Sequence, residues 1–197
     1  MPSLDPDFWE ERYRQGDTPW DIGAPSPPLM NYTRRATTPE TRILIPGAGR
    51  AYEAAELHRR GYRHLFVCDW APSAFRHLLD QAPDFPREHL LVQDFFQLAL
   101  EVDLILEQTF FCALDPALRP RYVDKCAELL APGGRLAGVL FASPFEREGP
   151  PFGGTADEYR RLFAPRFHIL QMELCEDSIE PRKGNELFVL LEKKLQG

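Results

Sequence analysis

The most constraining feature of this chain is a short apolar run that passes directly into a glycine turn. Residues 43–46 read Ile-Leu-Ile-Pro, and Gly47 and Gly49 follow at once. A second apolar run, 65–68, ends on Asp69. Glycine lets a backbone turn tightly and approach a ligand without a Cβ in the way. An acid at this distance downstream can accept both hydroxyls of a ribose. The pattern predicts the nucleotide-binding half of a Rossmann-like sheet.

Apolar periodicity along the chain predicts an α/β fold around this turn. Strands are expected over 42–46, 64–68, 89–92, 102–106, 136–141, 167–174 and 186–192. Helices are expected over 7–15, 29–35, 51–60, 72–81, 116–130 and 156–162. Strands that are apolar throughout and lie between helices are typical of a parallel sheet covered on both faces. Only a polar linker separates the last two strands. We therefore expect a Rossmann-like seven-stranded, mostly parallel sheet with an antiparallel C-terminal hairpin and helices on both faces.

Length and composition limit the class of protein. At 197 residues the chain is expected to form one domain over residues 1–197, with its Rossmann-like core over 42–192. The net charge of −7 argues against nucleic acid as a partner. No apolar run is long enough to span a membrane, and the N-terminus lacks the features of a secretion signal. The four cysteines and five histidines show no metal-ligand spacing. We expect buried free thiols, no metal, and a monomeric cytoplasmic protein.

The order of the expected elements favours methyl transfer over hydride transfer. A parallel sheet that ends in an antiparallel hairpin, without a second domain, is the usual plan of class I S-adenosylmethionine methyltransferases, which the chain resembles. Gln93-Asp94-Phe95-Phe96 follows the third strand, where such enzymes place an acid and an apolar neighbour around adenine. Pro132-Gly133-Gly134, before the fifth strand, is a turn that these folds commonly use. This comparison is one of fold, and fold alone does not give function.

Four stretches make the resemblance closer. They are Phe8-Trp9-Glu10-Glu11-Arg12-Tyr13 with Thr18-Pro19-Trp20-Asp21; Ile45-Pro46-Gly47-Ala48-Gly49-Arg50; Thr109-Phe110-Phe111-Cys112-Ala113-Leu114; and Ser178-Ile179-Glu180-Pro181-Arg182-Lys183-Gly184-Asn185-Glu186. Together they resemble the thiopurine methyltransferase superfamily, and especially its thiol and halide methyltransferase branch. The resemblance extends over residues 7–192.

The resemblance implies where S-adenosylmethionine binds. In that family the N-terminal segment folds over the cofactor, so residues 1–36 are expected to form a lid. The implied cofactor contacts are Trp9, Trp20, Gly47, Asp69, Asp94, Phe95 and Gln108. The residues alone leave alternatives open. Trp9 and Trp20 could fasten the N-terminal segment to the core, Asp69 could cap a helix, and Asp94 could be a turn residue.

On the acceptor side the expected contacts are Glu107, Phe110, Phe111 and Arg182. Glu107 follows the expected strand 102–106, at the edge where ligands bind in open α/β sheets. It could instead form a salt bridge or contact the methionine ammonium group. Phe110 and Phe111 could belong to the core, and Arg182 could pair with a nearby acid. The family commonly has Asp-Tyr where this chain has Glu107-Gln108, and the loss of that phenol indicates a different acceptor.

The chemistry of the donor explains why no catalytic residue is expected. A methyl group on a sulfonium is already activated, so the protein mainly aligns the acceptor and excludes water. A thiolate or halide acceptor needs no general base. We therefore predict transfer to a small thiol or halide. The alternatives are a thiopurine or other heteroaromatic thiol methyltransferase, a nicotinamide-dependent oxidoreductase, and a non-catalytic S-adenosylmethionine sensor.

Overall fold

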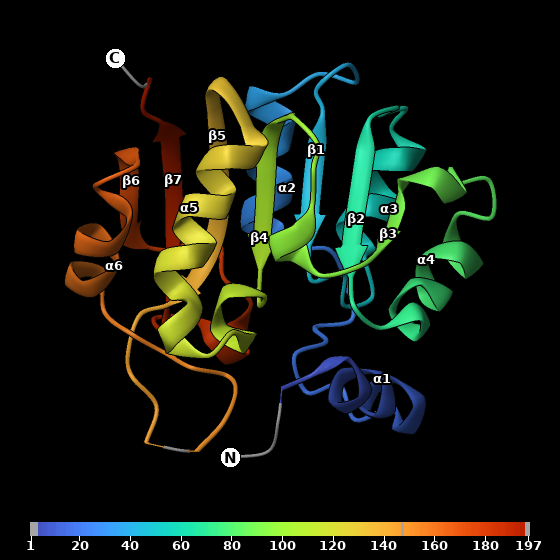
Figure 1. Cartoon of the computed structure of the whole chain (residues 1–197), viewed down its shortest axis with the longest axis horizontal. Coiled ribbons are helices and arrows are strands. Elements are labelled where there is room, and N and C mark those ends of the chain that lie inside the picture. Colours follow the sequence, from blue (N-terminus) through green and yellow to red (C-terminus); the bar gives the residue numbers. More distant parts are fainter. Residues whose placement is uncertain (1–3, 147, 196–197) are drawn as a thin grey trace.

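The computed structural model describes residues 4–146 and 148–195, which form a seven-stranded sheet covered by helices (Figure 1). The strands are β1 Ile43–Pro46, β2 Leu65–Asp69, β3 Leu90–Val92, β4 Val102–Gln108, β5 Leu130–Phe141, β6 Phe167–Leu174 and β7 Glu186–Lys193. Their order across the sheet is β3-β2-β1-β4-β5-β7-β6. Strands β1 to β5 are parallel, and β7 is antiparallel to both β5 and β6. The predicted mostly parallel sheet with an antiparallel C-terminal pair is confirmed.

Helices cover both faces of the sheet. They are α1 Pro6–Gln15, α2 Pro27–Ala36, α3 Tyr52–Arg59, α4 Phe75–Gln81, α5 Arg119–Leu129 and α6 Ala156–Phe163. In Figure 1, α5 and α6 lie in front of the sheet and α2 and α3 lie behind it. Helix α1 lies beyond the edge where the parallel strands end, and it contains no buried residue. In the described part of the chain, no helix is long and apolar enough to cross a membrane.

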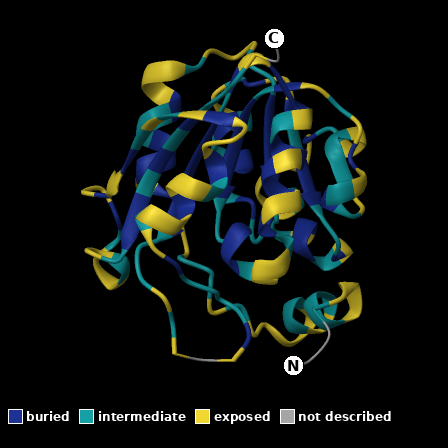
Figure 2. Ribbon diagram, turned by 60° about the vertical axis from the view of Figure 1, so that its left-hand side comes forward, coloured by how far each residue is buried: buried dark blue, intermediate teal, exposed yellow. Residues whose placement is uncertain are grey.

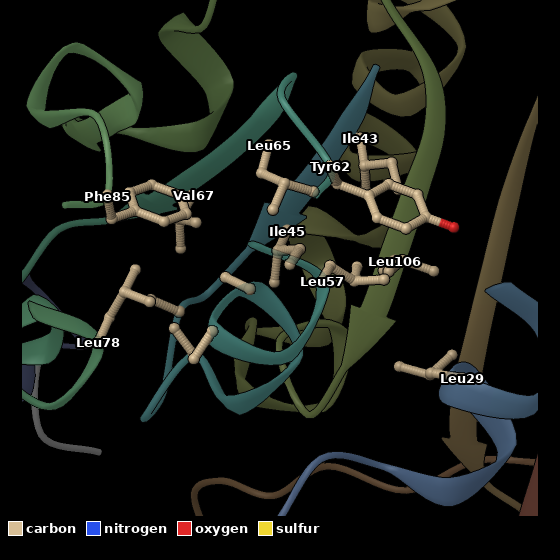
Figure 3. Close-up of a cluster of buried hydrophobic side chains, with 14 of the residues drawn as sticks. Leu29, Ile43, Ile45, Leu57, Tyr62, Leu65, Val67, Leu78, Phe85 and Leu106 are labelled. Atoms are coloured by element: carbon tan, nitrogen blue, oxygen red, sulfur yellow. The ribbon is translucent and has the colours of Figure 1, made fainter. Parts of the chain in front are cut away.

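The sheet divides the core into two clusters because successive strand residues point to opposite faces. Ile43 and Ile45 of β1 belong to one cluster, together with Leu57 of α3 (Figure 3). Leu44, between them, belongs to the other cluster with Tyr122 of α5. Figure 2 shows the strands as mostly buried and the outer surfaces of the helices as exposed. All four cysteines are buried free thiols, as predicted.

Several element boundaries differ from the sequence-based expectation. Strand β4 continues to Gln108 instead of ending at residue 106, and β5 begins at Leu130 instead of residue 136. The Pro132-Gly133-Gly134 segment is an irregularity inside β5, where the register against β4 shifts. The expected helix 116–130 is a 3-10 turn followed by α5, which has a proline in its first turn. Proline suits that position because the N–H it lacks has no partner within the helix.

Candidate active site

The glycine turn after β1 adopts backbone conformations that favour glycine. Gly47 has a φ of 63° and Gly49 has a φ of 54°. A Cβ on Gly47 would lie 2.5 Å from Cδ2 of Phe110, so the ring of Phe110 occupies the space that a side chain would need. A Cβ on Gly49 would lie 3.9 Å from the indole of Trp20. The turn is therefore enclosed by aromatic rings from two distant parts of the sequence.

Asp69 ends β2 beside this turn. Its Oδ1 accepts a hydrogen bond of 2.9 Å from the amide of Ala71, and its Oδ2 accepts one of 3.4 Å from the hydroxyl of Tyr13. Burial raises the pKa of Asp69 to about 6, although these hydrogen bonds act in the opposite direction. The carboxyl group therefore titrates near neutral pH and already binds one hydroxyl donor.

The N-terminal segment lies over the turn through an aromatic cluster. The ring of Trp20 packs edge-on against Trp9, with centroids 5.6 Å apart, and against Tyr13, with centroids 5.7 Å apart. Glu10 of α1 accepts hydrogen bonds from both the amide and the hydroxyl of Ser73. Because Ser73 follows β2 in sequence, these contacts hold α1 against the carboxyl end of the sheet.

A small cavity of about 40 Å³ lies beside the glycine turn. Gln108, the last residue of β4, lines it together with Arg50 and Glu53. The Oε1 atom of Gln108 is buried and has no hydrogen-bond partner within the described residues. Buried polar atoms are usually paired. The Oε1 of Gln108 can therefore accept a hydrogen bond from a donor that enters this cavity.

A larger cavity of about 340 Å³ extends along the carboxyl edge of the sheet. Its lining is mostly aromatic and aliphatic and includes Trp9, Tyr13, Trp20, Trp70, Phe95, Phe96, Phe110, Cys112, Leu114, Leu118, Phe141, Pro150 and Pro151. Asp69 and Asp94 line the part near β2 and β3, whereas Phe141 and Arg182 come from the ends of β5 and the β6–β7 linker. The lining therefore carries charges of both signs: Asp69 and Asp94 near β2 and β3, Arg12 from α1, Asp115 after Leu114, and Arg182 from the β6–β7 linker.

Most of the predicted site residues are brought together at this cavity. The residues that line it are Trp9, Trp20, Gly47, Asp69, Asp94, Phe95, Phe110 and Arg182. Gln108 lines the smaller neighbouring cavity. Asp94 also has the turn role that its sequence context allowed, because its side chain accepts a hydrogen bond of 2.9 Å from the amide of Phe96.

Glu107 and Phe111 are not brought to either cavity. Each is 1% exposed, and neither belongs to the lining of these two cavities. Glu107 accepts hydrogen bonds from the amides of Phe110 and Phe111 and from the hydroxyl of Tyr122, and burial raises its pKa to about 7. Contrary to expectation, the β4 extension places this carboxyl group inside the molecule, and Phe111 packs in the core.

Arg182 lies at the cavity wall with part of its hydrogen-bonding capacity used. Its Nη2 donates to the carbonyl of Trp20 at 3.0 Å, and its Nη1 lies 3.3 Å from Oε1 of Glu186. The guanidinium is also 5.7 Å from the ring centroid of Phe141. Arg182 therefore connects the N-terminal segment to the apolar end of the cavity.

Several lining residues were not among the predicted site residues, including Tyr13, Cys112, Pro150 and Pro151. Tyr13 lies one helical turn after Trp9, and this i, i+4 spacing could have indicated that both face the same ligand. Pro150 and Pro151 lie in a loop after β5, and Cys112 follows the two phenylalanines. Their approach to the cavity depends on tertiary contacts, such as the 2.7 Å hydrogen bond from the amide of Phe152 to the carbonyl of Cys112.

The fold is shared with solved methyltransferases. The 1,6-didemethyltoxoflavin-N1-methyltransferase of Burkholderia thailandensis, solved with S-adenosylhomocysteine, superposes with a TM-score of 0.76 at 18% identity, over 98% of this chain and 88% of that chain. The N-methyltransferase NodS of Bradyrhizobium japonicum superposes with a TM-score of 0.67 at 17% identity, over 95% of this chain and 88% of that chain. The chain therefore has the Rossmann-like fold that these methyltransferases share.

Sequence comparison gives the family. A family model for thiopurine S-methyltransferase matches residues 4–196. A probable thiol methyltransferase 2 of Arabidopsis thaliana is 32% identical over 90% of this chain and 81% of its own length. The thiopurine S-methyltransferase of Acinetobacter baylyi is 27% identical over 91% of this chain and 93% of its own length. The chain belongs to the thiopurine S-methyltransferase family and is an S-adenosylmethionine-dependent methyltransferase.

Proposed function

We propose that this enzyme transfers the methyl group of S-adenosylmethionine to a small thiol or halide. The observation that carries the proposal is the apolar end of the large cavity. Phe110, Cys112, Leu118 and Phe141 line it. Two side chains of opposite charge also line the cavity: Asp115, next to Leu114 in sequence, and Arg182 from the β6–β7 linker, whose guanidinium is 3.3 Å from Glu186 and faces the aromatic ring of Phe141. A cation beside aromatic walls favours a soft anionic nucleophile over a neutral or cationic one.

The residues at the other end fit the cofactor. Asp69 can accept the ribose hydroxyls, since it already accepts a hydroxyl from Tyr13. Asp94 and Phe95 provide a polar group and an apolar surface for adenine. The unpaired Oε1 of Gln108 suits the ammonium group of the methionine portion. When bound, S-adenosylmethionine supplies a methyl group on a positively charged sulfur, which is the electrophile of the reaction.

The residues of the chain would act by positioning and by excluding water. Phe110 lies against Gly47 and so forms a wall between the cofactor turn and the acceptor end. Arg182 would stabilise the negative charge of a thiolate or halide until the methyl group is transferred. Both deprotonated thiols and halide ions carry their own lone pairs, so alignment is the main requirement. No side chain needs to remove a proton at the moment of attack.

We further propose that residues 1–36 act as a lid over the cofactor. Residues 1–3 of this segment lie outside the described residues. The support for a lid is that α1 has no buried residue, yet contacts the site through Glu10, Tyr13 and the Trp9–Trp20 pair. Helix α1 can therefore open at low free-energy cost, whereas α2, with Leu29 and Met30 buried, would stay packed on the sheet. Opening would admit the cofactor, and closing would exclude water.

A thiopurine acceptor is the second candidate, because relatives such as the Acinetobacter baylyi protein carry that name. Other relatives favour the first candidate, including thiocyanate methyltransferase 1 of Brassica oleracea, which is 28% identical over 90% of this chain and 81% of its own length. The nicotinamide alternative does not agree with membership of a methyltransferase family. The sensor alternative has no support among these relatives.

An acceptor panel tests the proposal. S-adenosylhomocysteine release is followed with iodide, thiocyanate, hydrosulfide, a small alkyl thiol, an aryl thiol and a thiopurine. We expect turnover with the small anions and small thiols. Binding of S-adenosylhomocysteine is measured in parallel by calorimetry, to show that the protein sample used in the assay binds the cofactor product. Cofactor binding without turnover on any acceptor would contradict the proposal and revive the sensor alternative.

A further inference from the structure

We propose that Glu107 is a positioning residue for methyl transfer. It holds the turn of residues 109–112 so that Phe110 stays pressed on the glycine turn at the wall of the cavity. Glu107 touches neither cavity, so it would act through this turn and not on the acceptor. The role differs from the acceptor contact expected from its sequence position.

The first support is the hydrogen bonding of the carboxylate. Its Oε1 accepts from the amides of both Phe110 and Phe111, each at 2.9 Å, and its Oε2 accepts from the hydroxyl of Tyr122 at 2.8 Å. Both oxygens are therefore fixed, one by the turn and one by helix α5. A buried carboxylate with three neutral donors holds its partners firmly, because losing it would leave all three unpaired.

The second support is the packing around the same side chain. Gly138 of β5 lies so close to Glu107 that a Cβ there would be 2.8 Å from the Cβ of Glu107. On the other side of the turn, a Cβ on Gly47 would be 2.5 Å from Phe110. A continuous line of contacts thus runs from β5 through Glu107 and Phe110 to the glycine turn. Movement of the carboxylate would be transmitted to the cofactor turn.

The third support is backbone strain within the turn. Thr109 has a φ of 61°, a left-handed conformation that is unfavourable for a β-branched residue. Such a conformation persists only where its surroundings enforce it. The two amides that follow Thr109 are those bound by Glu107, and the Sγ of Cys112 donates to the carbonyl of Thr109 at 3.3 Å. Glu107 is therefore the main polar contact that maintains the strained turn.

Substitutions at Glu107 and Tyr122 test the proposal. In Glu107→Gln the amide oxygen can still accept from both backbone amides, so we expect kcat/KM for the best acceptor and the Kd of S-adenosylhomocysteine within about threefold of wild type. In Glu107→Ala the turn loses its hydrogen-bond acceptor. We expect kcat/KM to fall and the Kd of S-adenosylhomocysteine to rise, each by at least tenfold. Tyr122→Phe removes one of the three hydrogen bonds and should give an intermediate loss.

The matched control is Tyr62→Phe, which removes a buried hydroxyl that bonds Thr37 at 2.7 Å, away from the turn. It should leave kcat/KM and Kd unchanged, with all assays run well below each variant's melting temperature.

If Glu107→Gln loses as much activity as Glu107→Ala, Glu107 takes part in the chemistry directly and the proposal is wrong. Unchanged kinetics and binding in Glu107→Ala would show a role in stability alone. If Glu107→Ala does not fold, Tyr122→Phe decides, and wild-type values there would overturn the proposal.

Discussion

At the scale of single residues, Asp69 shows how burial changes the acidity of a carboxyl group at the proposed cofactor site. It is the last residue of β2, whose other four residues are apolar, and its partial burial there raises its pKa to about 6. The hydroxyl of Tyr13 partly compensates for the lost water. Ribose hydroxyls could replace or add to this donor, and they would favour the ionised form.

This gives a pH dependence for cofactor binding. Because the bound hydroxyls stabilise the carboxylate, binding below pH 6 must first remove a proton from Asp69. We expect the Kd of S-adenosylhomocysteine to rise as the pH falls through about 6 and to be constant above about 7. Calorimetric titrations between pH 5 and 8 measure it. Asp69→Asn should bind weakly at every pH, and an unchanged pH dependence in that variant would assign the effect to another group.

Glu107 gives a second pH dependence, in stability. Its pKa is about 7 in the folded protein and about 4.5 in the unfolded chain, so the folded state holds the proton more tightly. The free energy of unfolding of wild type relative to Glu107→Gln should therefore fall as the pH rises from about 4.5 to 7. The total change is roughly 3 kcal/mol, and the difference should be constant above that range. Urea unfolding at several pH values measures it, and a constant difference throughout would contradict the burial argument.

Glu107 also shows a limit of prediction from sequence. Because Glu107 follows the apolar run 102–106, the sequence predicted its carboxylate at the edge of the sheet where ligands bind. The structure extends the strand to Gln108, so the alternation of side chains turns Glu107 inward and places Gln108 at the small cavity. A shift of one or two residues in a strand boundary decides which side chain meets the ligand, and sequence patterns do not fix boundaries that closely.

At the scale of elements, α1 differs from α2: α2 has a buried face, whereas α1 has no buried residue and is held by aromatic contacts and a few hydrogen bonds. Helix α1 begins after Asp5, whose side chain accepts from the amide of Phe8 at 2.9 Å. A helix was predicted here over residues 7–15, close to the observed Pro6–Gln15. Its position over the site was implied only by the family resemblance, because an exposed helix has no strong apolar stripe to indicate its partner.

Trp20→Ala tests this element. The substitution removes the ring that covers Gly49 and packs against Trp9 and Tyr13. We expect the affinity for S-adenosylhomocysteine to fall by about tenfold, or roughly 1.4 kcal/mol, with little change in melting temperature. Arg14→Ala, an exposed position on α1, is the control and should bind as wild type. Wild-type affinity in Trp20→Ala would remove the lid from the proposed function.

At the scale of the whole molecule, the topology was predictable because the two kinds of strand leave different patterns. Buried parallel strands such as Ile43–Pro46 are apolar throughout, whereas Phe167–Leu174 alternates between buried and more exposed residues. The sheet order then places the carboxyl ends of β1, β2 and β4 together, which collects Gly47, Asp69 and Phe110 at one edge. Loop residues such as Pro150 reach the same cavity through tertiary contacts that no local pattern records.

The most direct test of the proposed function is the ratio of kcat/KM for hydrosulfide to kcat/KM for a thiopurine, measured by S-adenosylhomocysteine release under identical conditions. If the apolar end with Arg182 selects a small anionic acceptor, hydrosulfide should be preferred by at least tenfold. Arg182→Gln should reduce that preference while the enzyme still binds S-adenosylhomocysteine. A preference for the thiopurine in the wild-type enzyme would contradict the assignment of the acceptor and favour a heteroaromatic thiol.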